Sequence, residues 1–214
     1  FKVKDYEDSY FILGVSTRRE YEGQGFMKLL MNHVLDIYKD KRIYLQAYHP
    51  EIYMPFGFKE SHRHILYKLD KAKYALPSKI CLSQDINHLY DAYNLYVRDF
   101  SHYLIRDEDY FNNYLRKRCA AFNDSILTFK NEYGQQGYMI YNDKGKFVYI
   151  SEFIYSKEYL DDILKTISVY FYKDIRIETD CMASIHGEKT DMITMMCNQE
   201  DDIPLEKRYI NEIY

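Results

Sequence analysis

The first part of the chain alternates between two patterns of apolar residues. Residues 10–17, YFILGVST, form a short apolar run rich in aromatic and branched side chains, which is typical of a buried strand. From Gly25 to Tyr38 the apolar positions recur every three or four residues, which predicts an amphipathic helix. A second apolar run at residues 43–48 predicts another strand. The order strand, helix, strand indicates a crossover unit whose two strands lie parallel.

A change of pattern near residue 75 divides the chain. Residues 58–69 alternate in polarity and predict a hairpin or a long edge strand. Pro and Ser at residues 75–78 interrupt this pattern, and helical spacing then begins again. We therefore expect two units, residues 1–74 and residues 75–214, in an α/β (α+β) fold.

Helices and strands alternate again in the second unit. Ser156 has the position of a helix N-cap, and the apolar residues from Tyr159 to Ile167 recur at helical spacing, which predicts one buried helix face. The other predicted elements are helices around residues 89–96 and 110–115 and strands at residues 125–130, 137–141, 147–155 and 175–179.

The two units share a weak internal repeat. Residues 10–48 and residues 146–180 both follow the order strand, turn, amphipathic helix, Lys-Asp, strand. The first turn contains Gly23 and Gly25, whereas the second turn begins at Ser156 and contains no glycine. A repeat of this kind more often records a duplicated fold than a duplicated site. Only the first copy is therefore predicted to bind a ligand.

Composition and charge restrict the class of protein. At 214 residues, with a hydrophobic fraction of 47%, the chain suits one large or two small domains with ordinary buried cores. Its formal net charge of −4 does not favour a polyanion-binding surface, so nucleic acid is not an expected partner. No apolar run approaches the ~18 residues that cross a bilayer, and there is no basic-then-apolar leader. We expect a soluble, cytoplasmic protein without a membrane partner.

The side chains that could bind a metal are scattered. The four cysteines form no C-x-x-C pair, so free and mostly buried thiols are expected rather than a zinc site or a disulfide framework. His62 and His64 share one strand face, but no third ligand has a matching spacing, and we expect no metal. The 25 tyrosines occur in every segment without interleaved Arg and Lys, which favours packing over base stacking.

The turn before the first predicted helix is the best candidate for chemistry. Gly23 and Gly25 flank Gln24 between a predicted strand and a predicted helix. Such a turn presents backbone N–H groups without a side chain in the way, and the helix N-terminus adds a partial positive charge. A diphosphate is the natural ligand of this arrangement. A lone G-x-G pair also occurs at ordinary helix starts, so the surrounding sequence decides between the two readings.

That surrounding sequence resembles a known superfamily. The segment from Gly14 to Leu30 is similar to the coenzyme A loop of the GNAT superfamily, R/Q-x-x-G-x-G/A, and residues 52–58, IYMPFGF, resemble its Y-x-x-F-G-F signature. The second unit resembles the second domain of the enhanced intracellular survival (Eis) family, which joins two GNAT-like domains in tandem before a sterol-carrier-like domain. The resemblance implies two GNAT-like units, each a mixed, mostly antiparallel sheet flanked by helices. It also implies that the first unit is N-terminally incomplete and that the second lacks a coenzyme loop.

The resemblance further implies an N-acetyltransferase that uses acetyl-CoA as co-substrate and acetylates a primary amine by direct attack. The strand from Val15 to Thr17 would pair with the pantetheine arm, and the N–H of Val15 or Ser16 would stabilise the oxyanion of the tetrahedral intermediate. Tyr53 would protonate the departing thiolate. The implied coenzyme-binding residues are Val15, Ser16, Thr17, Gly23, Gln24, Gly25, Phe26, Met27 and Lys28.

Two positions depart from the superfamily pattern. Glu22 occupies the R/Q position, where a negative charge near a diphosphate is unfavourable by ~1 kcal/mol in solvent. Met27 stands where Gly or Ala usually allows the phosphate to approach closely. Two consequences stay open: either coenzyme binding is weaker, or Lys28, Arg18 or Arg19 compensates for these departures. These departures keep two alternatives open: a catalytically degenerate module that binds acyl-CoA or a protein partner, and a purely structural α/β protein.

The acceptor and the general base are left open by the sequence. The expected acceptor is a small-molecule amine or a lysine. The sequence is also compatible with a homo-oligomer. In the Eis family the base is the carboxylate of the chain terminus, supplied by the third domain, so no residue takes this role by correspondence. Glu20, His49 and Glu51 lie close enough in sequence to the motifs to be candidates.

Overall fold

The computed structural model describes residues 2–6, 8–76 and 78–211. Its helices are α1 (Phe26–Ile37), α2 (Leu89–Val97), α3 (Arg116–Phe122), which continues a π-helical turn at Tyr110–Leu115, and α4 (Leu160–Tyr170). Its strands are β1 (Ser9–Ile12), β2 (Arg42–Ala47), β3 (Lys59–Leu69), β4 (Cys81–Ser83), β5 (His102–Tyr103), β6 (Ser125–Asn131), β7 (Gly134–Asp143), β8 (Phe147–Tyr155), β9 (Asp174–Thr179), β10 (Gly187–Cys197) and β11 (Arg208–Tyr209).

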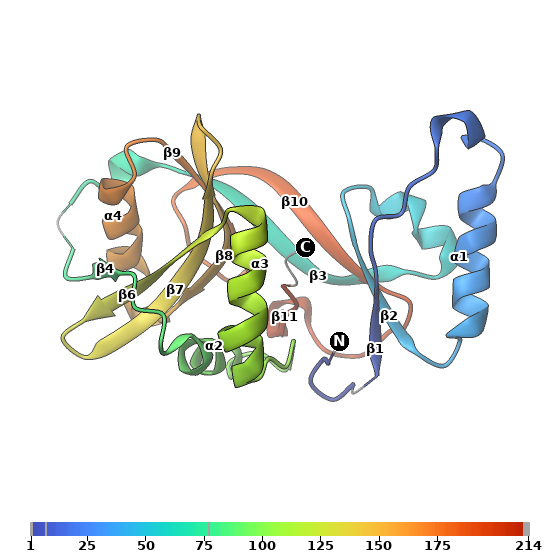
Figure 1. Cartoon of the computed structure of the whole chain (residues 1–214), viewed down its shortest axis with the longest axis horizontal. Coiled ribbons are helices and arrows are strands. Elements are labelled where there is room, and N and C mark those ends of the chain that lie inside the picture. Colours follow the sequence, from blue (N-terminus) through green and yellow to red (C-terminus); the bar gives the residue numbers. More distant parts are fainter. Residues whose placement is uncertain (1, 7, 77, 212–214) are drawn as a thin grey trace.

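One long sheet runs through the molecule. Its nine strands have the order β1-β2-β10-β3-β9-β8-β7-β6-β4, and β5 and β11 form a separate parallel pair. Figure 1 shows α1 over one end of this sheet and α2, α3 and α4 around the other end. Most neighbouring strands are antiparallel, so the predicted mixed, mostly antiparallel α/β sheet is confirmed.

The internal repeat is present in the structure. β1 and β2 are parallel over the pairs from Ser9↔Arg42 to Ile12↔Leu45, and α1 connects them. β8 and β9 are likewise parallel over the pairs from Phe147↔Asp174 to Ile150↔Ile177, and α4 connects them. Both crossover units were predicted from the apolar periods. In the first copy the ladder ends with β1 at Ile12, whereas β2 continues to Ala47. In the second copy both strands continue beyond the ladder, β8 to Tyr155 and β9 to Thr179.

The two copies exchange their next strands. β3 follows the first crossover unit in sequence but pairs with β9 of the second, and β10 follows the second but pairs with β2 of the first. β3 and β10 also pair with each other from Leu69↔Gly187 to Lys59↔Cys197 and form the long crossing ribbon of Figure 1. The prediction that residues 58–69 form a hairpin or an edge strand is therefore wrong. The division into units 1–74 and 75–214 stays a prediction about domains, since the sheet is continuous across it.

Two local predictions also differ from the structure. The strand predicted for residues 10–17 ends at Ile12, because Gly14 takes a positive φ of 62° that turns the chain away from β2. Leu13 and Val15 are 53% and 37% exposed, so this segment is not a buried strand. Ser156 makes no side-chain capping hydrogen bond, and a short 3-10 turn, Lys157–Tyr159, precedes α4 instead.

The apolar core is unevenly divided between the two ends of the sheet. The larger cluster joins β6–β9 with α2, α3 and α4, and fully buried aromatic residues such as Phe129 and Tyr138 lie within it. A small cluster between α1 and β2 contains Met31, Ile43 and Met196. Within the described part of the chain, no helix is long and apolar enough to cross a membrane.

Buried histidines lie where the two copies meet. His62 and His64 on β3 and His102 on β5 are at most 2% exposed. Tyr44 Oη lies 2.7 Å from Nε2 of His102, and Nδ1 of His64 lies 2.9 Å from a carboxylate oxygen of Glu178. Burial lowers the pKa of His102 to about 4 and that of His62 well below its usual range. Burial also opposes the charge of His64, but the hydrogen bond and charge of Glu178 raise its pKa.

These shifts predict a loss of stability in mild acid. Below about pH 6.5 the unfolded chain protonates His62 and His102, whereas the folded protein keeps His102 neutral down to about pH 4, so the free energy of unfolding falls between these values. His64 acts in the opposite sense: its contribution is present below pH 6.5 and is lost as the pH rises through its raised folded pKa. At ~1.4 kcal/mol per pKa unit, His102→Gln should reduce the decrease in the free energy of unfolding between pH 6.5 and pH 4 by about 3 kcal/mol. Urea unfolding from pH 7 to pH 4 measures it, and an unchanged pH slope in the variant contradicts it.

Candidate functional site

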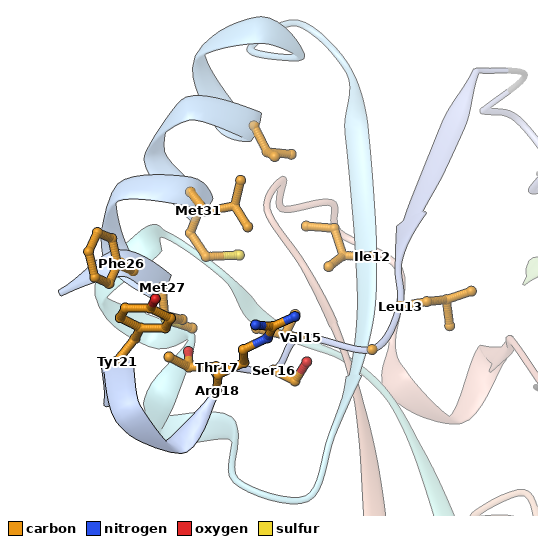
Figure 2. A pocket seen from close by; sticks show the side chains of 13 residues that line it. Ile12, Leu13, Val15, Ser16, Thr17, Arg18, Tyr21, Phe26, Met27 and Met31 are labelled. Carbon is orange, nitrogen blue, oxygen red and sulfur yellow. The ribbon is translucent and has the colours of Figure 1, made fainter. Parts of the chain in front are cut away.

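A pocket of about 520 Å³ lies between α1 and the chain that follows β1. Figure 2 shows the side chains of Ile12, Met27 and Met31 meeting there from the two elements. On α1 the lining positions include Met27, Leu30 and Val34, which share one face because they are spaced three and four residues apart. The pocket is therefore a largely apolar cleft with one wall from a helix and one from an open strand end.

The strand-side wall of the pocket is the chain that continues beyond the pairing of β1 with β2. Their ladder ends at the pair Ile12↔Leu45, although β2 continues to Ala47. In the part of the chain that the structure describes, the segment from Leu13 to Thr17 joins no strand ladder. Its peptide groups can pair with an extended ligand as a neighbouring strand would.

The turn into α1 leaves the helix N-terminus open. Gly25 is the N-cap in a left-handed conformation with φ 81°, and it provides no side-chain cap. The first turn of α1 contains no acidic residue, and the N–H of Leu29 donates to the carbonyl of Gly25 at 3.0 Å. The N–H groups in the first turn of a helix have no intrahelical acceptor. This end of the helix therefore offers donors and a partial positive charge to an anion.

The glycine turn is held in place by its own backbone and one amide. Gly23 has a positive φ of 73°, and the Gln24 Nε2 donates to the Glu20 carbonyl at 3.0 Å. A Cβ placed on Gly23 or Gly25 would meet no atom within 4 Å, so the glycines serve the backbone conformation rather than a close contact within the protein.

The structure separates the predicted coenzyme residues into two groups. Val15, Ser16, Thr17, Phe26 and Met27 line the pocket. The remainder form the turn and the first helical turn beside it without lining it: Gly23, Gln24, Gly25 and Lys28.

Sequence reasoning missed several lining residues. Tyr21 lines the pocket from the 3-10 turn Arg19–Tyr21, and Arg18, which the sequence offered only as one of three compensating charges, lines it from the residue before that turn. Leu30 and Val34 line it from α1, and their spacing from Met27 would have identified them. No comparable period marks Arg18 or Tyr21, because they lie outside the regular elements.

Tyr53 lies in the second motif, apart from the pocket lining. It joins two short 3-10 turns, Pro50–Ile52 and Met54–Phe56, and Gly57 ends the second of them with φ 85°. The Tyr53 ring is half-buried and meets the fully buried Phe58 edge-on, with 6.3 Å between ring centroids. The Y-x-x-F-G-F sequence thus has a physical basis: Gly57 makes the sharp turn and Phe58 anchors it in the core. Nearby, His49 Nδ1 lies 3.2 Å from an exposed carboxylate oxygen of Glu51.

The second copy of the fold differs at the same place. α4 buries Ile163, Leu164 and Ile167 against the sheet, whereas α1 buries Met31 alone among its residues. Beyond the β8–β9 ladder, the Tyr155 hydroxyl donates to the Asp180 carboxylate at 3.1 Å and links the two strand ends. The second copy thus has more of its helix buried and a link between its strand ends, and a smaller pocket of about 170 Å³ lies beside Tyr155 and Ser156 on the side of α2.

Comparison with known proteins agrees with this geometry. Residues 8–61 match the family model described as an acetyltransferase (GNAT) domain. The fold is similar to a GCN5-related N-acetyltransferase from Anabaena variabilis, at 13% identity and TM-score 0.64, over 87% of this chain and 54% of that chain. It is also similar to Eis1 from Mycobacterium abscessus, at 12% identity and TM-score 0.56, over 87% of this chain and 55% of that chain.

A tandem GNAT protein from the clavulanic acid biosynthesis pathway has a similar fold at 11% identity and TM-score 0.54, over 90% of this chain and 76% of that chain. No curated protein matches the sequence. The chain spans about half the length of the Anabaena and Mycobacterium proteins. The protein thus has the GNAT acetyltransferase fold. Residues 8–61, in its first copy, match a GNAT domain model, and its similarity in fold to the Eis and tandem GNAT proteins extends over most of the chain.

Proposed function

We propose that the protein is an N-acetyltransferase that transfers an acetyl group from acetyl-CoA to a primary amine. The observation that carries this proposal is the open strand end beside an uncapped helix N-terminus in the first copy, together with the link between the strand ends in the second. An extended chain with an anionic end fits such a cleft, because one wall offers unpaired peptide groups and the other offers helix N–H donors.

In this proposal the coenzyme lies along the pocket. Its diphosphate is bound at the turn of Gly23, Gln24 and Gly25 and by the first N–H groups of α1, at Phe26, Met27 and Lys28. Its pantetheine arm pairs with the backbone from Val15 to Thr17 against the apolar side chains of the pocket. The volume of about 520 Å³ is within the ~300–1,000 Å³ of small-molecule sites.

The proposed chemistry is direct transfer. The amine nitrogen attacks the thioester carbonyl carbon, and the backbone N–H of Val15 or Ser16 stabilises the negative oxygen that forms. When the intermediate collapses, the C–S bond breaks, the C–N bond remains, and Tyr53 gives its proton to the thiolate sulfur. The amine loses a proton to a base that is not assigned. A small amine or a lysine side chain is the proposed acceptor.

Calorimetry with acetyl-CoA, followed by measurement of thiol release with a panel of small amines and lysine peptides, tests the proposal. Saturable binding and amine-dependent release of coenzyme A are expected. Absence of binding at millimolar acetyl-CoA contradicts the proposal. Binding without turnover contradicts the proposed enzymatic activity and favours a module that only binds acyl-CoA. Glu22, at the Arg or Gln position of the superfamily pattern, is consistent with such a module.

Replacement of Tyr53 separates chemistry from binding. Tyr53→Phe should lower kcat about 10²-fold or more, the size typical of a lost general acid, and should leave the Kd for acetyl-CoA nearly unchanged. The ring contact with Phe58 is retained in this variant, so folding is preserved. Tyr48→Phe is a matched control, because Tyr48 is an exposed tyrosine near the same turn. Equal activity of Tyr53→Phe and Tyr48→Phe excludes the role of Tyr53.

A further inference from the structure

We propose that Arg18 supplies the cationic contact for the diphosphate of the coenzyme, since Glu22 occupies the Arg or Gln position of the superfamily pattern. The inference rests on the proposed function and names the residue that recognises the negative charge of the diphosphate. The sequence alone left three basic residues open for this role: Arg18, Arg19 and Lys28. Their positions in the structure distinguish between them.

Arg18 is the charged side chain of the pocket. Among the described residues that line the cleft, no other carries a formal charge. In Figure 2 the Arg18 guanidinium is directed toward the middle of the pocket, above the segment that carries Val15 and Ser16. Within the ranges that the structure describes, Arg18 pairs with no carboxylate. A planar guanidinium that has no partner in the protein can bind two phosphate oxygens at once.

The local backbone fixes Arg18 at the mouth of the cleft. Its carbonyl accepts a hydrogen bond from the Tyr21 N–H at 2.8 Å, which starts the 3-10 turn Arg19–Tyr21. Arg18 itself is extended, with φ −62° and ψ 142°, so it continues the strand-like segment after Thr17. Arg18 therefore lies along the chain between the segment proposed for the pantetheine arm, Val15 to Thr17, and the glycine turn proposed for the diphosphate.

The other candidates point elsewhere. Lys28 follows Met27 on α1, and at 100° per residue it lies about 130° around the helix from the middle of the pocket-lining face. Arg18, Arg19 and Glu22 are all exposed, and of these three side chains Arg18 is the one that lines the pocket. Its guanidinium is thus the charged group placed in the cleft in which the coenzyme is proposed to lie.

Binding of coenzyme A and of pantetheine to the whole protein tests the inference, since pantetheine lacks the diphosphate. Arg18→Gln should raise the Kd for coenzyme A about tenfold or more and leave the Kd for pantetheine within twofold. Arg19→Gln removes the same charge one residue away and should leave both values within twofold. The Arg18→Gln variant should also lose part of the salt dependence of coenzyme A binding, because it removes one charge contact.

The outcomes separate this inference from the proposed function. If the unmodified protein binds coenzyme A and Arg18→Gln binds it equally well, the inference is overturned and the proposed function stands. If Arg18→Gln weakens coenzyme A and pantetheine equally, Arg18 does not recognise the diphosphate, and the inference is again overturned. If the unmodified protein binds no coenzyme A, the proposed function fails, and the role of Arg18 fails with it.

Discussion

Residues 1–74, produced without the rest of the chain, are expected to remain unfolded, and mixing them with residues 75–214 is expected to restore the structure. The reason is the exchange of strands, because β10 from the second part lies between β2 and β3 of the first. Without β10, the first part loses Met195 and Met196, which are 1% exposed in the whole protein. Each buried methionine contributes roughly 1.5–3 kcal/mol, and two sheet edges also lose their hydrogen-bond partners. Circular dichroism of each fragment and of the mixture measures the effect.

A protein that is cut only after folding provides the control. A protease site placed at residues 78–79, in the connection before β4, should be cleavable in the folded protein with both parts remaining associated. Cleavage should lower the free energy of unfolding only through the loss of the connection. A cooperative thermal transition in residues 1–74 alone would show that the first copy folds without β10, and the two copies would then be independent domains.

Local patterns predict those parts of the fold that depend on neighbours in sequence. The period of α1 and the apolar runs of β2, β8 and β9 give both crossover units, because a helix that covers two parallel strands has to be amphipathic and the strands apolar. The exchange of β3 and β10 has no such signal. An interior strand is recognised by burial on both faces, but β3 carries Arg63 and Lys68 at exposed positions among its buried residues, which reads as an edge.

The candidate site was predictable where a backbone conformation requires a particular residue. Gly23 and Gly25 adopt positive φ, which glycine accommodates without strain, so the two glycines in the sequence indicate the turn before α1. Arg18 was named as one of three alternatives, since a single arginine in a loop carries no periodicity. The end of the β1–β2 ladder at Ile12 also has no signal in the sequence, because the apolar run continues through Val15 although the ladder does not. The side-chain position of Arg18 and the shape of the pocket thus required the structure.

Gly25→Glu is expected to weaken coenzyme binding at least tenfold. The new carboxylate would stand at the N-cap of α1, beside the donors proposed for the diphosphate. Two like charges at ~4 Å repel by ~1 kcal/mol in water and more in a partly dry cleft, and the diphosphate carries more than one charge. The left-handed backbone, with φ 81°, adds roughly 1–2 kcal/mol of strain for a residue with a Cβ. This strain lowers the free energy of unfolding of the free and the bound protein alike. The loss of affinity comes from the repulsion: at ~1 kcal/mol for each of two phosphate charges it corresponds to at least tenfold, measured by calorimetry with acetyl-CoA.

Gly25→Asn separates the charge from the strain. Asparagine tolerates the left-handed region, its side chain is neutral, and a Cβ at this position meets no atom within 4 Å, so its effect should be below about threefold. Gly145→Glu places the same charge on a glycine with φ 78° in the distant turn between β7 and β8, and it should leave the affinity unchanged. A carboxylate at a helix N-terminus favours the helix, so lost binding in Gly25→Glu cannot be attributed to unfolding of α1. Equal weakening by Gly25→Asn and Gly25→Glu would mean that the conformation of the turn, and not an anion at the start of α1, controls binding.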